Sequence, residues 1–156
     1  MISIKKHSKP AFILIFLLLS FSGKPERYDT KSDIAGIWLT QSGESMIQIS
    51  KVDKYYNGTV YWLKFPISPY TGKAKVDIKN PDPKKRSIPI IGLNILINFK
   101  YSAEKKTGEG NIYDPKSGTT YNCSAELTEA NTLKIRGYIG ASWMGLGRTE
   151  IWKRIK

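Results

Sequence analysis

The chain has 156 residues, a formal charge of +12, one histidine and one cysteine. This length suits one domain with a hydrophobic core, and a lone cysteine excludes an intramolecular disulfide. The histidine, His7, lies near the N-terminus, so residues 23–156 contain no imidazole. That excludes Ser-His-Asp and Cys-His catalysis and the usual zinc sites from this part of the chain.

Residues 1–22 have the order of an export signal. Three lysines precede an apolar run of 11 residues, 11–21, and Ser20 and Ser22 are small residues at positions −3 and −1 of a cleavage site after Ser22. An uncleaved membrane anchor is the alternative, but it requires a longer apolar run. We therefore expect a signal peptide, 1–22, and a soluble protein in the periplasm or outside the cell.

Removal of the signal would leave a basic protein. Without its three lysines, 22 Lys and Arg oppose 13 Asp and Glu, a charge of +9. The lysines are spread along the chain rather than confined to one stripe, and an exported protein seldom meets nucleic acid, so no nucleic-acid partner is expected. An anionic envelope surface or simple solubility explains the charge better.

After a polar and flexible lead-in, 23–33, the remaining residues, 34–156, are expected to form one domain of short strands. The patterns predict strands at 36–40, 45–52, 59–65, 91–101, 111–114, 119–128, 132–139 and 147–154. Asn57-Gly58 predicts a hairpin turn, and 114–118 predicts a type I turn with a bulge. Short strands with regularly spaced turns indicate an all-β sandwich or barrel.

Two of the expected strands have distinctive faces. From Ile91 to Tyr101 every second residue is apolar, so that face should lie in the core, with Gly92 as a candidate bulge. Residues 59–65 are apolar on both faces, so they are either covered on both sides or expose a patch that could be an interface.

The polar stretch 77–89 precedes the strand at 91–101. Its three prolines forbid regular pairing. Asp77, Asn80 and Asp82 raise the alternative of a calcium loop, but they do not alternate, no distal Glu follows, and neighbouring lysines would repel a cation. We expect a bend that leads into the strand.

Cys123 is expected in the core. It shares one strand face with Tyr121, Ala125 and Leu127, whereas Thr120, Asn122, Ser124 and Glu126 form the other face. Burial on an apolar face is more typical of packing than of a reactive thiol.

Four stretches in order, "NPDPKKRSIPIIGLNIL", "GEGNIYDPKSGTTYNC", "LKIRGYIG" and "GRTEIWKR", resemble the DUF2147 family of small exported bacterial proteins. The resemblance runs from about Gly36 to Arg154. It implies a single antiparallel β-barrel of about eight strands, similar to the lipocalins and other calycins. The family pattern maps onto Asn80, Pro81, Arg86, Gly92, Asp114, Pro115, Gly118, Tyr121, Arg136, Gly137, Gly147, Arg148 and Trp152. Paired cysteines of some members are missing here, so a redox role is not expected.

The lipocalin comparison extends to the two ends of the domain. Lipocalins begin their first strand with Gly-x-Trp and place an Arg of the last strand against that Trp. Here Gly36 and Trp38 provide the first motif, and Arg148 and Arg154 flank the closing strand. A cation on an indole suits the seam of a closed barrel.

A barrel of this size holds either side chains or one small ligand. The candidate ligand-binding residues are Trp62, Tyr113, Tyr121, Trp143 and Trp152 as an apolar lining, with Arg136 or Arg148 meeting an acidic head group. The alternative is that most of these aromatic residues fill the interior.

We therefore expect an exported, non-enzymatic binding protein for an apolar or amphipathic, fatty-acid-like molecule. The alternative is a structural or interaction protein of the cell envelope with a filled barrel. An enzyme ranks third, because no paired carboxylates or metal-ligand cluster are visible, and no cofactor is expected.

Overall fold

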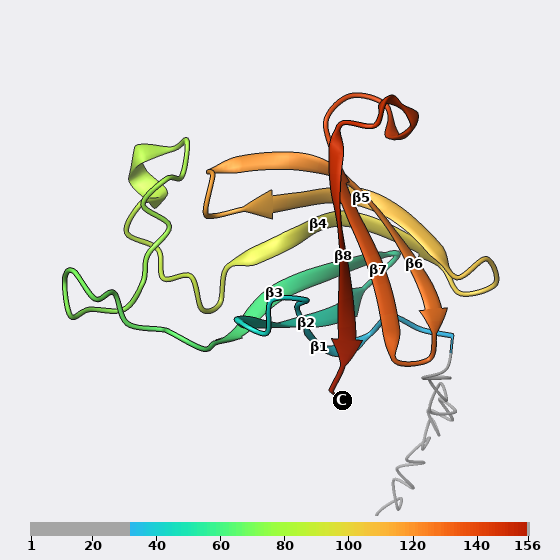
Figure 1. The fold of residues 1–156 in the computed structure, drawn as a ribbon, viewed down its shortest axis with the longest axis horizontal. Coiled ribbons are helices and arrows are strands. Elements are labelled where there is room, and N and C mark those ends of the chain that lie inside the picture. The colour runs from blue at the N-terminus through green and yellow to red at the C-terminus, as the bar shows by residue number, and fades with distance from the viewer. Residues whose placement is uncertain (1–31, 156) are drawn as a thin grey trace, which may run out of the picture.

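The computed structural model describes residues 32–155, apart from the side chain of Trp143. They form a closed antiparallel barrel of eight strands in which sequence neighbours pair and β1 meets β8, as the sequence predicts (Figure 1). The strands are β1 (Gly36–Leu39), β2 (Ser45–Val52), β3 (Tyr55–Leu63), β4 (Asn94–Ser102), β5 (Thr107–Asp114), β6 (Thr119–Glu129), β7 (Thr132–Tyr138) and β8 (Gly147–Arg154), with short 3₁₀ helices η1 (Pro83–Lys85) and η2 (Ser142–Met144). Within residues 32–155 no helix is long and apolar enough to cross a membrane. The expected signal peptide lies outside the described residues.

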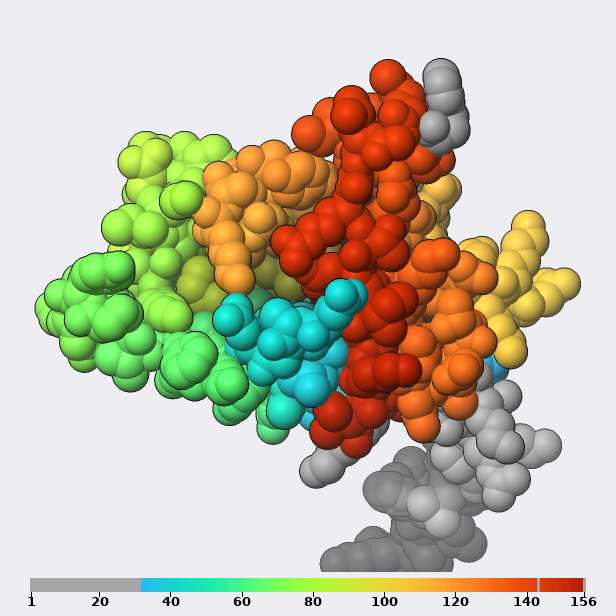
Figure 2. Space-filling model, viewed as in Figure 1, coloured from blue at the N-terminus to red at the C-terminus, as the bar shows by residue number. Residues whose placement is uncertain are grey.

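Antiparallel pairing sorts the connections to the two ends of the barrel. The β1–β2, β3–β4, β5–β6 and β7–β8 connections lie at one end, which we call the open end. The short β2–β3, β4–β5 and β6–β7 turns and the segment 32–35 lie at the other, the closed end. Figure 2 shows a hollow at the open end, between the β5–β6 turn (orange), β8 (red) and the β1–β2 turn (cyan).

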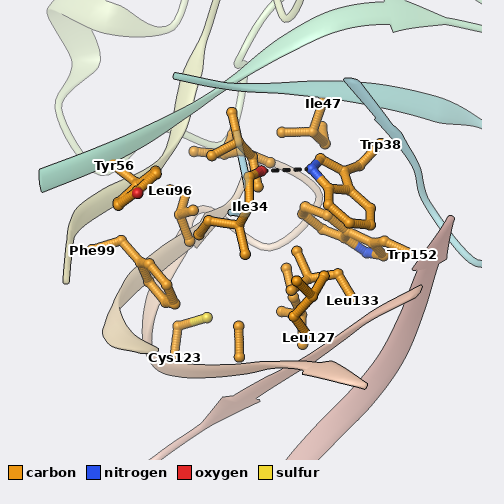
Figure 3. Packing of buried hydrophobic residues seen from close by; sticks show 14 of the residues in the cluster. Ile34, Trp38, Ile47, Tyr56, Leu96, Phe99, Cys123, Leu127, Leu133 and Trp152 are labelled. Carbon is orange, nitrogen blue, oxygen red and sulfur yellow. Dashed lines mark hydrogen bonds between the residues drawn. The ribbon is translucent and has the colours of Figure 1, made fainter. Parts of the chain in front are cut away.

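Large apolar side chains fill the closed half of the barrel. Trp38, Phe99, Leu127, Leu133 and Trp152 are each at most 2% exposed and lie together inside the strands (Figure 3). Burial of each such side chain stabilises the fold by roughly 1.5–3 kcal/mol. The core therefore belongs to the fold itself and leaves this half of the barrel without room for a ligand.

The segment before β1 closes the end of this core. Ile34 is fully buried, and its carbonyl accepts a 2.8 Å hydrogen bond from Nε1 of Trp38. The hydroxyl of Tyr101 donates to the carbonyl of Ser32 at 3.0 Å. Because the indole N–H and the backbone carbonyl are both satisfied, Ile34 can lie in the apolar core without an unpaired polar group.

Arg154 completes the seam between β8 and β1. Its guanidinium lies 4.2 Å from the ring centre of Trp38. It also donates to the carbonyls of Asp33, Ala35 and Ala130, which belong to the N-terminal segment and the β6–β7 turn. The predicted cation–indole contact therefore exists, and it is made by Arg154. Arg148 does not make it: its side chain is 84% exposed and forms an ion pair with Glu150.

The hairpin predicted at Asn57-Gly58 is wrong. The β2–β3 turn is at Asp53 and Lys54, with Asp53 at φ 54°, and Gly58 lies inside β3. A Cβ atom on Gly58 would lie 2.7 Å from Cβ of Leu96 on β4. Glycine is needed here because β4 passes too close for a side chain.

The alternation from Ile91 to Tyr101 predicts the inner face of β4 only in part. Ile95 and Phe99 are buried as expected, but Ile91 lies in the turn before β4 and is 45% exposed. Leu96, expected on the opposite face, is buried against Gly58. Leu96 and Phe99 both point inward because Asn98, whose φ of 51° and register shift mark a bulge, inserts one residue between them. Gly92 lies in the turn before β4, at φ 92°, rather than at a bulge within the strand.

We expect Arg154→Ala to lower the free energy of unfolding by about 2–4 kcal/mol, because it removes the cation–indole contact and the donors to the partly buried carbonyls of Asp33 and Ala35. Chemical denaturation measures this. Arg148→Ala is the matched control and should change the value by less than about 0.5 kcal/mol, since its ion pair is exposed. Equal effects of the two substitutions would contradict the assignment of the seam to Arg154.

Candidate functional site

Alternate residues of β8 point into the barrel. Trp152 pairs with the buried Leu133, and Glu150 pairs with the buried Ile135. Side chains two residues apart on a strand share a face, so Trp152, Glu150 and Arg148 follow one another from the core to the open end. A charged pair thus lies directly above the indole at the top of the core.

These three side chains contact one another. Nε1 of Trp152 donates to Oε2 of Glu150 at 3.2 Å, and Nη2 of Arg148 lies 3.2 Å from Oε1 of the same carboxylate. The Glu150 side chain is 31% exposed and that of Arg148 is 84% exposed. The carboxylate is therefore held between core and solvent, while the guanidinium, with donors on three nitrogens, reaches into the entrance.

The adjoining wall of the mouth, on β5, β6 and β7, is apolar and has a glycine where a side chain would fit. Gly137 lies opposite the buried Cys123, and a Cβ atom at this glycine would lie 3.5 Å from Cγ2 of Ile112 and 3.8 Å from Cβ of Tyr121. These are ordinary contact distances, so a side chain could occupy this position. The register of β5 with β6 places Ile112 opposite Tyr121, on the inner face. We call Ile112, Tyr121, Gly137, Arg148 and Glu150 the mouth.

An ion pair crosses the rim of the mouth. Nζ of Lys116 in the β5–β6 turn lies 3.2 Å from Oε2 of Glu44 in the β1–β2 turn. The two turns meet at the edge of the hollow in Figure 2. Both side chains are largely exposed, so this pair contributes little stability; it bounds the opening on one side.

Below the mouth the barrel closes tightly. A Cβ atom on Gly108 would lie 2.5 Å from Cε1 of Phe99, and one on Gly110 would lie 2.7 Å from Cα of Phe99. The inner face of β5 has no side chain at these two positions because Phe99 occupies the space. A ligand that enters the mouth therefore meets a solid floor.

A second concavity lies outside the barrel, on the β1–β8 seam. It is an open groove of about 310 Å³ lined by Leu39, Thr40, Gln41, Gly43, Ile151 and Lys153. Oε1 of Gln41 accepts from the backbone N–H of Ile151 at 2.8 Å, where β1 has already ended. Leu39, Ile151 and Lys153 alternate with the buried Trp38 and Trp152, so they point outward, and the groove does not open into the core.

The predicted ligand-binding residues are only partly brought together. Tyr121 and Arg148 lie at the mouth, and Trp152 lies beneath it in the core, at 2% exposure. Arg136 pairs with Thr149 on the outer face and donates to its hydroxyl at 3.4 Å. The Trp143 side chain lies outside the described residues.

Trp62 and Tyr113 also lie on the outer face, contrary to the prediction. A register shift in β3 places Trp62 opposite Met46, next to the inward Leu63, and leaves the indole 37% exposed. Tyr113 alternates with the inward Ile112 and is buried from outside by the β3–β4 connection. Neither residue can line the interior of the barrel.

Glu150 is a site residue that the sequence interpretation missed. The signal was available: in "GRTEIWKR", Trp152 is an expected inward residue, and Glu150 and Arg148 lie two and four positions before it. Glu150 does not fit a pattern of paired carboxylates, because its partners are an arginine and an indole.

The stretch 77–89 forms a bend without strand structure, as predicted, but it is anchored to the barrel rather than merely polar. The Asp77 carboxylate is fully buried and accepts hydrogen bonds from the Tyr113 hydroxyl at 2.8 and 2.9 Å and from Nδ2 of Asn80 at 2.7 Å. Nε of Arg86 donates to the carbonyl of Asn80 at 2.8 Å. With these donors the buried carboxylate is satisfied, and it holds the bend against β5.

The β5–β6 turn is shaped to receive this bend. The backbone N–H of Gly118 donates a hydrogen bond to the carbonyl of Asp114 at 2.8 Å. Gly118 has a positive φ of 75°. A Cβ atom on Gly118 would lie 2.0 Å from the carbonyl oxygen of Lys79. Lys79, which precedes Asn80 and Pro81, therefore packs against the turn that follows Asp114 and Pro115.

Cys123 is fully buried, and burial raises the pKa of its thiol to about 12. The thiol is protonated at physiological pH and has no access to oxidants. The prediction that it packs in the core is confirmed.

This fold is that of a lipocalin-like barrel. A solved structure, protein HP1028 from the human pathogen Helicobacter pylori, described as belonging to the lipocalin family, matches with a TM-score of 0.66 and 22% identity over 80% of this chain and 84% of that chain. The chain matches the family described as "Uncharacterized protein conserved in bacteria (DUF2147)" over residues 36–154, and it belongs to that family. A comparison with curated proteins gives no match.

We expect Tyr113→Phe to change how stability depends on alkaline pH. Burial and the hydrogen bond to Asp77 raise the pKa of Tyr113 to about 12, from 10 in the unfolded chain. The neutral phenol therefore stabilises the fold below pH 10, and this contribution is lost between pH 10 and 12. Denaturation curves should show the stability advantage of the wild type over Tyr113→Phe shrinking in that interval. A stability difference between the two proteins that stays constant from pH 10 to 12 would contradict the assignment of this effect to Tyr113. Other residues that titrate in this interval, such as Tyr101, do so in both proteins and cancel in the difference.

Proposed function

We propose that this protein is an exported, non-enzymatic binding protein that holds a small amphipathic molecule at the mouth of its barrel. The observation that carries the proposal is the inward face of the open end, where Arg148 and Glu150 lie beside the apolar wall of Ile112 and Gly137. An apolar wall with a few placed polar groups is typical of small-molecule sites.

The filled lower half of the barrel limits the ligand. Phe99, Trp152 and Cys123 form the floor, so a long chain cannot run down the axis as it would in a hollow barrel. The ligand we propose is of medium length, with an anionic head at Arg148 and its chain against Ile112, Tyr121 and Gly137. Arg148 keeps donors for a carboxylate because its contact with Glu150 uses one nitrogen.

We expect decanoate to bind with micromolar affinity, on the order of −8 kcal/mol. Arg148→Gln should weaken decanoate about tenfold and decanol less than about threefold, because only the acid has a charge-assisted contact to lose. Gly137→Leu should abolish both, since its side chain would fill the space beside Tyr121. Calorimetric titration measures the affinities, and Arg136→Gln, on the outer face, is the matched control.

A folded Gly137→Leu protein that binds decanoate like the wild type would overturn the mouth as the site. The same holds if Arg136→Gln and Arg148→Gln weaken decanoate equally, which would indicate a general charge effect. As an independent readout, ligand at 100 times the dissociation constant should stabilise the wild type by about 2.7 kcal/mol in thermal melts.

A second function has its own support. The closed half of the interior is packed. Residues 59–65, predicted to be apolar on both faces, expose Tyr61 by 53%, Trp62 by 37% and Phe65 by 57%. A packed barrel with an exposed aromatic patch fits an interaction protein of the cell envelope.

A further inference from the structure

The β3–β4 connection forms a projecting hairpin. Ile67 and Ala74 form an antiparallel bridge, the N–H of Ser68 donates to the carbonyl of Lys73 at 2.8 Å, and Gly72 turns the chain at φ 64°. In Figure 1 this green hairpin extends away from the barrel on the left, and Figure 2 shows it at the edge of the molecule. We call residues 64–75 the projecting hairpin.

The projecting hairpin exposes apolar side chains. Phe65 is 57% exposed, Ile67 is 52% exposed, and Tyr70 at the tip is 95% exposed. Single exposed apolar residues are common on protein surfaces, but two aromatic residues and an isoleucine on one protruding hairpin form a patch. The shape is convex, so these side chains are presented outward rather than sheltered in a groove.

Lysines surround this patch. Nζ of Lys64 lies 5.5 Å and Nζ of Lys75 lies 5.9 Å from the ring centre of Phe65. The whole connection, 64–91, contains seven Lys and Arg against two Asp, a formal charge of +5 within a chain of +12. Of the two carboxylates, Asp77 is buried and Asp82 caps η1, so the outer surface of the connection is strongly cationic.

The barrel holds the projecting hairpin in place. Val76 bridges to Pro89, and the N–H of Ile90 donates to the carbonyl of Lys75 at 2.9 Å. Asp77, which follows Val76 in the chain, is buried and accepts a hydrogen bond from Tyr113 of β5, so this end of the connection is fixed to the barrel. The patch is thus ordered before any partner arrives, which lowers the entropic cost of binding.

We propose that the projecting hairpin docks on the surface of an anionic phospholipid bilayer. Phe65, Ile67 and Tyr70 enter the boundary between head groups and acyl chains, where aromatic side chains are favoured. Lys64, Lys73 and Lys75 meet the lipid phosphates, and each contributes by attraction to the negative surface.

Charge and shape favour a bilayer over the other partners. A protein groove that covered Phe65 would have to desolvate the two ammonium groups beside it. Single-stranded nucleic acid stacks on aromatic rings within a cationic groove, but this hairpin is convex, and Pro66 and Ile67 between its two aromatic residues stack no base. This docking does not depend on a ligand in the mouth.

The test is co-sedimentation of the full chain with vesicles of phosphatidylcholine alone or with 30% phosphatidylglycerol. We expect binding only with the anionic lipid. Lys64→Gln with Lys73→Gln should weaken it by about fivefold per lysine. Phe65→Ser with Tyr70→Ser should weaken it at least about tenfold, since each buried ring contributes to insertion. All four positions are exposed, so the fold should be unaffected, which thermal melts check.

The matched control is Lys51→Gln with Lys105→Gln, which removes the same charge from exposed lysines at the closed end of the barrel. It should reduce binding less than about threefold. A blue shift of tryptophan fluorescence with anionic vesicles supports insertion near Phe65, because Trp62 is exposed whereas Trp38 and Trp152 are buried. Equal losses in the control, no binding to anionic vesicles, or equally tight binding to a single-stranded oligonucleotide would each overturn the proposal. Decanoate binding in these variants should stay at the wild-type value, which separates this result from the function proposed for the mouth.

Discussion

The contact between Arg154 and Trp38 closes the barrel, and much of the structure depends on it. β1 and β8 share only two residue pairs in their ladder, Trp38 with Arg154 and Leu39 with Lys153. A seam with so few backbone hydrogen bonds is weak by itself. The guanidinium compensates by joining three elements at once: β8, the segment before β1 and the β6–β7 turn. Together with the hydrogen bond from Trp38 to the carbonyl of Ile34, these contacts hold Ile34 over the core.

Local patterns in the sequence were sufficient for the parts of the fold that depend on local chemistry. The Gly36-Ile-Trp38 start, the alternating face around Cys123 and the limits of β2 and β8 agree with the structure because strand alternation is a property of each segment alone. Gly58 shows the limit. Its Asn-Gly sequence is typical of a hairpin, but the approach of β4 decides its place within β3, and no local pattern reports that approach.

The sequence predicts the positions of the strands better than it predicts which side chains point into the barrel and which point outward. One extra residue at Tyr61 reverses the faces that follow it, so Trp62 points outward. Another extra residue, at Asn98, separates Leu96 from Phe99, so both of these side chains point inward. The aromatic side chain of Tyr113 predicts a place in the interior, and the residue is indeed buried. However, Tyr113 is buried by the β3–β4 connection on the outside of the barrel, where it bonds Asp77, a residue 36 positions earlier in the sequence. Burial from outside by a distant segment leaves no periodic signal.

The buried Asp77 also explains why the long β3–β4 connection is ordered. A carboxylate removed from water is costly unless its oxygens are satisfied, and here Tyr113 and Asn80 supply the donors. The cost of breaking this arrangement fixes the bend, and with it the projecting hairpin, to β5. Both proposed surfaces lie at the open end because the other end is used for closure by Ile34 and Arg154. A molecule that partitions into lipid would therefore approach the mouth from the same end of the barrel as the bilayer on which the projecting hairpin docks.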